Sequence, residues 1–222
     1  NDAGYCYYLV GQYDKALKNF KEALAIDKRL GREAGIARKL NNIGNVYHSW
    51  GQYDKAIKNF KEALATFKKL GQESSVPTVL SNIGNVYNSW GQYDKALKHF
   101  EEALVIDKRL GREADVANRL NNIGLVYKSW GQYDKAMKYY EEALATFKKL
   151  GQEGSVTTVL NNIGNVYYSQ GKYKIAIKYF KESVRKKEKL RKTATGDVRR
   201  DYLASQLGTY QLLTSAYIRD SD

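Results

Sequence analysis

The residues on which catalysis and metal binding most often depend are scarce in this chain. It has one cysteine, Cys6, and two histidines, His48 and His99. A single cysteine excludes an internal disulfide, and no group of ligands has the spacing of a metal site. No glycine-rich phosphate loop appears, and the paired acids Glu101 and Glu102 are adjacent on a predicted helix, so they point in different directions. We therefore expect no enzyme activity, no metal and no cofactor.

Proline and long apolar runs are also nearly missing. The one proline, Pro77, suits an almost entirely helical chain. No run approaches the roughly 18 apolar residues of a membrane span, and residues 1–10 lack a charged segment followed by a cleavage site. Of the 222 residues, 43% are hydrophobic and 27% are charged, as in folded proteins. We expect a cytoplasmic protein, and the single cysteine is consistent with a reducing compartment.

What the chain has in abundance is self-similarity. Residues 11–50 match residues 51–90 at 27 of 40 positions, and they match residues 91–130 at 31 of 40. Repeats of this length indicate stacked supersecondary units rather than one globular core. The better match at twice the distance gives a second period of 80 residues. We attribute the longer period to duplication of the gene, and a functional alternation of two unit types remains the other explanation.

Each unit predicts two amphipathic helices. Apolar residues recur at steps of three and four over residues 36–50 and again from Tyr53 to Leu70. Gly51 and its copies should end the first helix in left-handed backbone, and Pro77 should fall in a first turn. One column supplies residues suited to an N-cap ahead of the first helix: Gly35, Ser75, Asp115 and Ser155. The two helices should pack antiparallel, and neighbouring pairs must stack to bury their apolar faces.

The run LNNIGNVYHSWGQYDKAIKNFKEAL at residues 40–64 resembles a tetratricopeptide repeat. The residues at that family's signature positions are Leu40, Ile43, Gly44, Tyr47, Gly51, Tyr53, Ala56, Phe60 and Ala63. The unit is longer than the family's usual length of about 34 residues and has Lys68 in place of a proline. In this it is similar to the repeats of kinesin light chain. The resemblance implies an all-α fold, a right-handed superhelical solenoid of antiparallel helix pairs.

The repeats also predict the organisation of the chain. Residues 1–192 should form the array, with a partial first unit, four full periods from 11 to 170 and a final second helix at 171–192. Gly4 and Tyr7 align with Gly44 and Tyr47, so we expect the chain to begin inside a first helix and to be cut from a longer protein. Residues 193–222 should form a longer helix that leads to a missing segment.

The tail LRKTATGDVRRDYLASQLGTYQLLTSAYIR resembles the segment that joins bacterial tetratricopeptide arrays to a caspase-like peptidase domain of the CHAT type. The resemblance implies that the array is the sensor or recruitment part of a larger multidomain protein.

The first helix of each unit has a polar face that packing does not require. In the family this helix lines the concave surface, so the resemblance implies that its polar columns form the floor of a groove. Asparagine carries donors and an acceptor, which suits it to hold the backbone of an extended peptide. The predicted peptide-groove residues are Arg38, Asn41, Asn42, Asn45, His48, Asn82, Asn85, Asn88, Asn121, Asn122, Leu125, Lys128, Asn161, Asn162, Asn165 and Tyr168. The alternative is that the asparagines only bond between neighbouring helices or survive from duplication.

Side-chain preference should come from the variable column of His48, Asn88, Lys128 and Tyr168, with Leu125 as an apolar spot. The family's carboxylate-clamp subgroup holds a terminal carboxylate with lysine and arginine in the groove. Here Arg38, Arg119 and Lys128 fall in separate units, which argues against such a clamp.

Positive charge is in large excess, with 37 Lys and Arg against 24 Asp and Glu, a net charge of +13. Much of it lies in columns of the second helix, which we interpret as a solvated convex face. We expect a protein–protein interaction scaffold that binds an extended peptide or a partner helix in the groove, and an acidic partner suits the charge. Two alternatives stay open: a nucleic-acid-binding adaptor that uses the convex face and residues 181–200, and end-to-end self-association of unfinished repeats. No membrane partner is expected.

Overall fold

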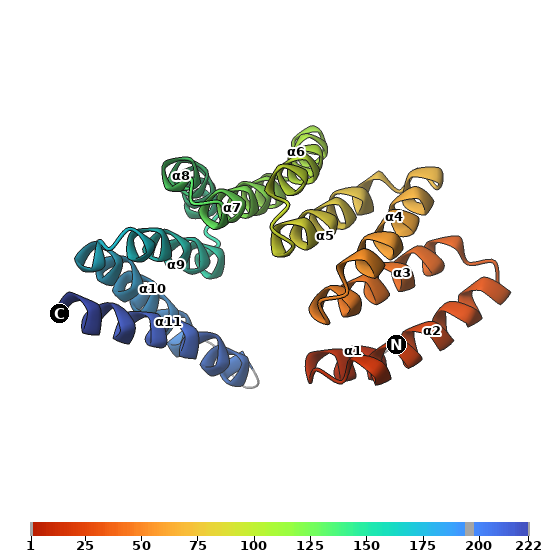
Figure 1. Ribbon diagram of the computed structural model, residues 1–222, viewed down its shortest axis with the longest axis horizontal. Helices are drawn as coiled ribbons and strands as arrows, with labels where there is room; N and C mark the ends of the chain where they lie inside the picture. Colours follow the sequence, from red (N-terminus) through yellow and green to blue (C-terminus); the bar gives the residue numbers. More distant parts are fainter. Residues whose placement is uncertain (1, 194–197, 222) are drawn as a thin grey trace. The chain divides into compact units, whose positions relative to one another are not determined.

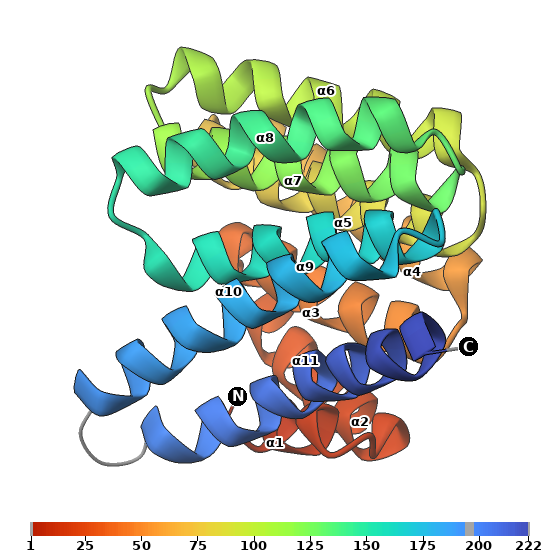
Figure 2. The same cartoon turned by 90° about the vertical axis from the view of Figure 1, so that its left-hand side faces the viewer.

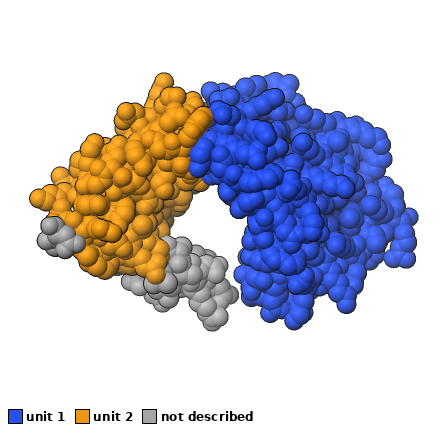
Figure 3. Space-filling view, in the orientation of Figure 1, with its two compact units in different colours: residues 1–111 blue, residues 112–222 orange. Residues whose placement is uncertain are grey.

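The computed structural model describes the backbone of residues 2–193 and 198–221, and the side chains of residues 3–190 and 208–220. Within those residues every regular element is a helix, which confirms the all-α prediction. The chain divides into two compact units, residues 1–111 and residues 112–222 (Figure 3). Residues 194–197 of the tail that resembles a peptidase linker lie outside the described residues.

Unit 1 consists of consecutive antiparallel helices and one short 3-10 turn, η1 (Figure 1). Its elements are α1 (Asp2–Leu9), α2 (Tyr13–Arg29), α3 (Glu33–Ser49), α4 (Tyr53–Lys69), η1 (Glu73–Ser75), α5 (Val76–Ser89) and α6 (Tyr93–Arg109). The predicted first helices are α3 and α5, and the predicted second helices are α2, α4 and α6. Each helix packs on the next, so that α3 contacts both α2 and α4.

Unit 2 continues the same pattern. Its helices are α7 (Glu113–Ser129), α8 (Tyr133–Lys149), α9 (Glu153–Ser169), α10 (Tyr173–Thr193) and α11 (Val198–Ser221). Figure 2 shows α10 lying between α9 and α11, and α10 packs against both. The part of α11 with described side chains contributes Ala216 to the buried cluster built around Phe180 of α10.

The turn after each first helix is closed by backbone hydrogen bonds, as the glycine column predicts. The N–H of Gly51 donates to the carbonyl of His48 at 2.9 Å, and the N–H of Gln52 donates to the carbonyl of Tyr47 at 2.8 Å. Gly51 has φ +74°, a left-handed conformation in which a side chain would be strained. The predicted end of the first helix is therefore confirmed.

The predicted N-cap column is wrong for α3, α7 and α9. The helices α3, α7 and α9 begin at Glu33, Glu113 and Glu153, two residues before that column, and no capping side chain bonds to them. Backbone bonds close the preceding turn instead, because the N–H of Arg32 donates to the carbonyl of Asp27 at 2.9 Å. The acidic residue in the first turn is also stabilised by the positive end of the helix dipole.

The helix α5 differs from the other first helices because it begins after η1. Ser75 stands at its boundary but makes no side-chain cap bond, whereas Pro77 falls in the first turn as predicted. A proline has no N–H to donate to the carbonyl four residues earlier, which here belongs to Glu73. The first turn therefore stays 3-10, and α5 is 14 residues long where α3 has 17.

The core of unit 1 depends on close approach between the helices of a pair. Phe60 of α4 is completely buried, and a β-carbon on Gly44 of α3 would lie 2.6 Å from its ring. Glycine is thus required at this column because the aromatic ring fills the space. Leu80 and Ile83 of α5 are buried in the same cluster as Phe60, so this core continues from α4 into the next pair.

The 80-residue period has a structural counterpart where a second helix meets the following first helix. In the first of these junctions, Asp27 of α2 and Lys39 of α3 are nearly buried, with the ammonium nitrogen 3.8 Å from a carboxylate oxygen. In the next junction the same positions hold Phe67 and Val79, both in one buried apolar cluster. The positions that alternate with the 80-residue period therefore contact each other, and both change from charged to apolar between the two junctions.

Candidate functional site: a groove lined by the first helices

The predicted groove residues of unit 1 lie together on α3 and α5. Arg38 is exposed, and the remaining members are half-buried: Asn41, Asn42, Asn45 and His48 on α3, and Asn82, Asn85 and Asn88 on α5. Side-chain bonds join the two helices at both ends of this row, between Asn41 and Asn82 and between His48 and Ser89. The asparagine columns of the two helices therefore form one continuous polar face within unit 1.

The asparagine pair has a defined geometry. The amide nitrogen Nδ2 of Asn82 donates to Oδ1 of Asn41 at 2.9 Å. The pair recurs in unit 2, where Nδ2 of Asn162 donates to Oδ1 of Asn121 at 2.8 Å. Bonding between neighbouring helices, the alternative explanation for these columns, thus accounts for one bond of each pair.

Each asparagine pair still has hydrogen-bonding capacity to offer a ligand. A side-chain amide has two N–H donors and an oxygen with two acceptor sites. One bond within the pair leaves both donors of Asn41 and the acceptor oxygen of Asn82 unused among the described residues. A donor and an acceptor side by side match the C=O and N–H of a peptide backbone. The bond also fixes the orientation of both amides before any ligand arrives.

Asn42, Asn45 and Asn85 make no side-chain hydrogen bond within the described residues, and each is half-buried. Asn41 and Asn82 therefore fix the row through their bond, and Asn42, Asn45 and Asn85 keep all of their side-chain donors and acceptors available.

A cavity of about 440 Å³ opens between α3 and α5 at the N-terminal end of this row. Three predicted residues line it, Arg38, Asn41 and Asn42. Six other lining residues were not predicted: Lys39, Phe67, Ser74, Ser75, Thr78 and Val79. Most of the lining residues carry hydrogen-bond donors, and the others form an apolar wall. This lining suits a ligand with acceptor groups.

The sequence contains a pattern that could have identified the cavity-lining residues that were not predicted. The alternation between the two unit types is concentrated at residues 26–39 and their copies, and both Lys39 and Val79 belong to it. Columns that covary across a repeat junction mark positions that contact one another.

His48 lies at the other end of the row. Its Nε2 is 3.0 Å from the hydroxyl of Ser89, and its ring centroid is 6.1 Å from that of Tyr53. Burial lowers the pKa of His48 because the charged imidazolium loses solvation. A neutral imidazole can both donate and accept, so His48 offers hydrogen bonding without added charge.

In unit 2 the predicted residues again divide between two first helices. Half-buried members are Asn121, Asn122, Leu125 and Lys128 on α7, and Asn161, Asn162, Asn165 and Tyr168 on α9. Asn161 donates to the hydroxyl of Thr209 on α11 at 2.9 Å, so its amide serves the contact with the last helix. Tyr168 packs edge-on against Tyr173 with ring centroids 5.3 Å apart.

Lys187 of α10 also reaches the hydroxyl of Thr209, at 3.1 Å. Burial lowers the pKa of Lys187 because the ammonium is desolvated. Its position in the repeat is the one held by Asp27 and Phe67 in earlier junctions. A third chemistry thus occupies this column where α10 meets α11.

Several lysines of the second helices have partners within their own units. The ammonium of Lys55 lies 5.5 Å from the ring centroid of Tyr47 and 2.7 Å from Oε1 of Gln52. At the opposite end of the helix, Lys69 pairs with Glu33 at 2.8 Å, and Lys149 pairs with Glu113 in unit 2. The lysine side chains of these columns therefore have protein partners, whereas a solvated face would leave them in water. Exposed ion pairs of this kind add little stability.

Within the described residues, no group of three or more histidine, cysteine, aspartate and glutamate side chains is arranged to hold a metal ion. A separate search of those residues finds no helix with the length and apolar character that a membrane span requires.

Comparison with known structures places the fold. The structure is similar to that of BtubC (BKLC) from P. vanneervenii, with 24% sequence identity, a TM-score of 0.76, and coverage of 95% of this chain and 85% of that one. It is also similar to a putative kinesin light chain from Podosopora anserina with nearly identical TPR-like repeats, at 18% identity and a TM-score of 0.69, covering 86% and 94% of the two chains.

A Rap protein complexed with Competence and Sporulation Factor has a TM-score of 0.73 and 19% identity, and 96% of this chain aligns with it. This chain spans only 64% of the Rap protein's length. At these identities the likeness shows the fold alone.

No curated protein matches the sequence. Models of the tetratricopeptide repeat match residues 1–69 and 75–149, and a further one matches residues 158–189. These matches cover most of the chain and include part of every predicted repeat. The chain belongs to the tetratricopeptide repeat family.

Proposed function

We propose that this chain is a non-enzymatic protein-interaction scaffold that holds an extended peptide, or one helix of a partner, along the polar face of its first helices. The array is proposed to serve as the recruitment part of a larger protein. The observation that carries the proposal is the asparagine pair, in which one hydrogen bond orients two amides and leaves a donor and an acceptor unused.

The free asparagines extend this face. Asn45 and Asn85 follow Asn41 and Asn82 by one helical turn, and neither has a side-chain partner within the described residues. Mid-helix asparagine is unfavourable relative to alanine by up to about 0.7 kcal/mol. Half-buried amides without a protein partner are available to a ligand, and each bond to it would contribute about 1 kcal/mol.

An acidic or acceptor-rich ligand fits the N-terminal end of the row. The cavity there combines the exposed guanidinium of Arg38 with the amides of Asn41 and Asn42 and the hydroxyl of Thr78. The similar Rap protein was solved in complex with Competence and Sporulation Factor, which supports a partner-binding role for the array.

The nucleic-acid alternative has less support. Lysines that would form a continuous basic face lie over tyrosine rings or pair with glutamates, as Lys55 and Lys69 do. Half of residues 181–200, the segment that would add a basic patch, have side chains outside the described range. The end-to-end assembly of chains stays a prediction from sequence.

The proposal is tested by selecting peptides from a random display library against the full chain and measuring their affinity for two matched double variants. Asn45→Ala with Asn85→Ala removes two free amides from the proposed groove. Asn19→Ala with Asn59→Ala removes two half-buried amides from second helices, where each bonds the carbonyl four residues earlier at 2.9 Å and 2.8 Å.

We expect the groove variant to lose about tenfold or more in affinity, since two hydrogen bonds of about 1 kcal/mol each are removed. The control should bind as the wild type does, with the helical content of both checked by circular dichroism. Equal losses in the two variants, or full affinity in the groove variant, would contradict the proposal.

A further inference from the structure

All three tryptophans of the chain occupy one column, the last residue before the turn that follows a first helix. Trp50, Trp90 and Trp130 are 38%, 39% and 37% exposed. In unit 1, Trp50 lies over Tyr13 with ring centroids 6.0 Å apart and an interplanar angle of 35°, and Trp90 lies over Tyr53 at 5.8 Å and 41°. Unit 1 therefore presents two large, partly open aromatic faces.

Neither the turn nor the stacking of units requires tryptophan at this column. The same column holds Val10 in the partial first repeat and Gln170 in the fourth complete repeat. Both residues are followed by a glycine in left-handed backbone. The equivalent position before the turn of a second helix holds leucine, as at Leu30 and Leu70. Exposure of an indole that a smaller residue could replace points to a ligand.

A cavity of about 350 Å³ adjoins the first aromatic pair and is lined by Gly11, Gln12, Tyr13, Asp14, Lys15 and Trp50. Asp14 is exposed and makes no ion pair within the described residues. The ammonium of Lys15 lies 5.4 Å from the ring centroid of Tyr7, so this charge is directed to another ring. The cavity thus places an unpaired carboxylate beside an aromatic face.

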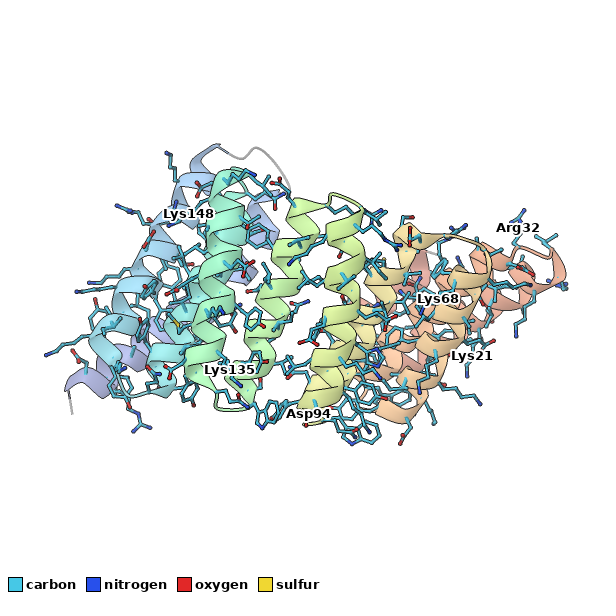
Figure 4. All side chains as sticks on the ribbon, turned by 90° about the horizontal axis from the view of Figure 1, so that it is seen from above. Lys21, Arg32, Lys68, Asp94, Lys135 and Lys148 are labelled. Carbon is cyan, nitrogen blue, oxygen red and sulfur yellow. The ribbon has the colours of Figure 1, made fainter. Side chains whose placement is uncertain are left out.

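The arrangement repeats at the next pair. Asp54 is exposed and without an ion pair among the described residues, while Lys55 is held by Tyr47 and by Gln52. Figure 4 locates this edge of unit 1 by Asp94, which has the same position in its repeat as Asp54 has in the preceding one.

We propose that this tryptophan edge, formed in unit 1 by Trp50 and Trp90 with Asp14 and Asp54, binds arginine side chains of a basic segment in a second protein. A guanidinium is planar, stacks on indole and phenol rings, and donates hydrogen bonds from its edge to a carboxylate. An arginine side chain can therefore contact the aromatic ring and the carboxylate at the same time. An acidic ligand would be repelled by the carboxylates, and a proline-rich one would leave them unused.

The edge is separate from the asparagine groove and does not depend on it. Single contacts between an exposed cation and a ring are weak. Useful affinity therefore requires at least two arginines engaged at once, spaced to reach successive repeats. A scaffold with this edge would hold a basic partner while its groove holds another chain.

The tryptophans serve as fluorescence reporters, because the protein has no tryptophan outside this column. The full chain is titrated with a fluorescein-labelled peptide of alternating arginine and glycine, and with versions in which lysine, glutamate or proline replaces arginine. Tryptophan emission and peptide anisotropy are both recorded at physiological salt. The variants are Asp14→Asn with Asp54→Asn, and Trp50→Gln with Trp90→Gln, which introduces the residue already present at Gln170.

The chain supplies its own control. In unit 2 a cavity of about 370 Å³ has the same lining, Gly131, Gln132, Tyr133, Asp134 and Lys135, but with Gln170 in place of tryptophan. Asp134→Asn therefore removes the same carboxylate from a site without the indole. We expect it to leave affinity for the arginine peptide within about twofold of the wild type.

The arginine peptide should change tryptophan emission and bind at least about fivefold more tightly than the lysine peptide, because lysine cannot stack as a plane. Both double variants should weaken it about tenfold, as expected when paired contacts are lost. Equal binding of lysine and arginine, tighter binding of the glutamate or proline peptide, no binding of any peptide, or full affinity in the aspartate variant would each overturn the proposal. The aspartate variant decides the matter if the tryptophan variant proves unfolded.

Discussion

The junction of α2 with α3 and the junction of α4 with α5 pack the same elements with opposite chemistry. The first joins Asp27 and Lys39 across a gap of 3.8 Å, and the carboxylate lies so close to Gly35 that a β-carbon there would be 2.6 Å away. The second places Phe67 and Val79 in an apolar cluster. A repeated backbone thus fixes where two side chains meet and leaves their chemistry free, provided that both change together.

The difference extends to the groove. Lys39 and Val79 both line the cavity at its N-terminal end, on opposite helices. The 80-residue period therefore alternates the character of the floor as well as the junctions beneath it. Duplication explains how such a period arises, whereas the contact between the alternating positions explains why its members must be kept as sets.

The largest effect is expected from emptying the apolar junction. Phe67→Ala should lower the free energy of unfolding by about 3–4 kcal/mol, because it removes a fully packed ring and leaves a cavity. Urea unfolding followed by circular dichroism measures this change. Thr66→Ala, which affects the neighbouring half-buried residue, serves as a control and should change stability by less than about 1 kcal/mol. A loss below about 1 kcal/mol for Phe67→Ala would show that this junction does not depend on the ring.

An intermediate effect is expected from breaking the polar junction. Lys39→Val alone leaves the nearly buried Asp27 with only the exposed Arg32, 3.9 Å away, and should destabilise the chain by about 1–3 kcal/mol. The triple variant Asp27→Phe, Gly35→Ser and Lys39→Val copies the apolar junction. It should recover to within about 1 kcal/mol of the wild type, since a packed apolar pair replaces a buried ion pair without loss.

The comparison between these two variants tests the idea that junction residues act as sets. A triple variant that is no more stable than Lys39→Val would mean that each junction is adapted to its own place in the array. The urea midpoints, measured under one condition, decide between the two.

The smallest effect separates the two roles of asparagine. Asn82→Ala removes the bond to Asn41 and should reduce stability by about 1 kcal/mol. Asn85→Ala removes no bond within the described residues and should stay within about 0.5 kcal/mol of the wild type. Thermal unfolding of the two variants side by side provides the measurement. Equal destabilisation by both would assign the whole asparagine row to packing.

Much of the fold could be predicted because its signals are local and repeated. The glycine at residue 51 has a conformational requirement that four copies make visible, and the single proline at residue 77 is restricted to a first turn by its missing N–H. The N-cap prediction failed because it relied on side-chain type alone. The preceding turn satisfies its own backbone through the bond from Arg32 to Asp27, and the helix can begin two residues earlier.

The candidate site was only half predictable. Periodicity identified the polar face of α3, because subtracting the apolar stripe leaves Arg38, Asn41 and Asn45 at helical spacing. It did not show that Asn82 would reach Asn41, since that bond depends on the offset between stacked helices rather than on the pattern within one. For the same reason the cavity residues contributed by α5 were missed.

The free amides on the first helices are proposed to receive a ligand's backbone, and side-chain resonances test this role most directly. The full chain, labelled with ¹⁵N, is titrated with a peptide selected for binding, and the asparagine amide and tryptophan indole signals are followed by NMR. We predict that the Asn45 and Asn85 amides shift on binding while those of Asn19 and Asn59 on the second helices stay unmoved. Shifts confined to the Asn19 and Asn59 amides or to the indoles, with Asn45 and Asn85 unchanged, would contradict the claim.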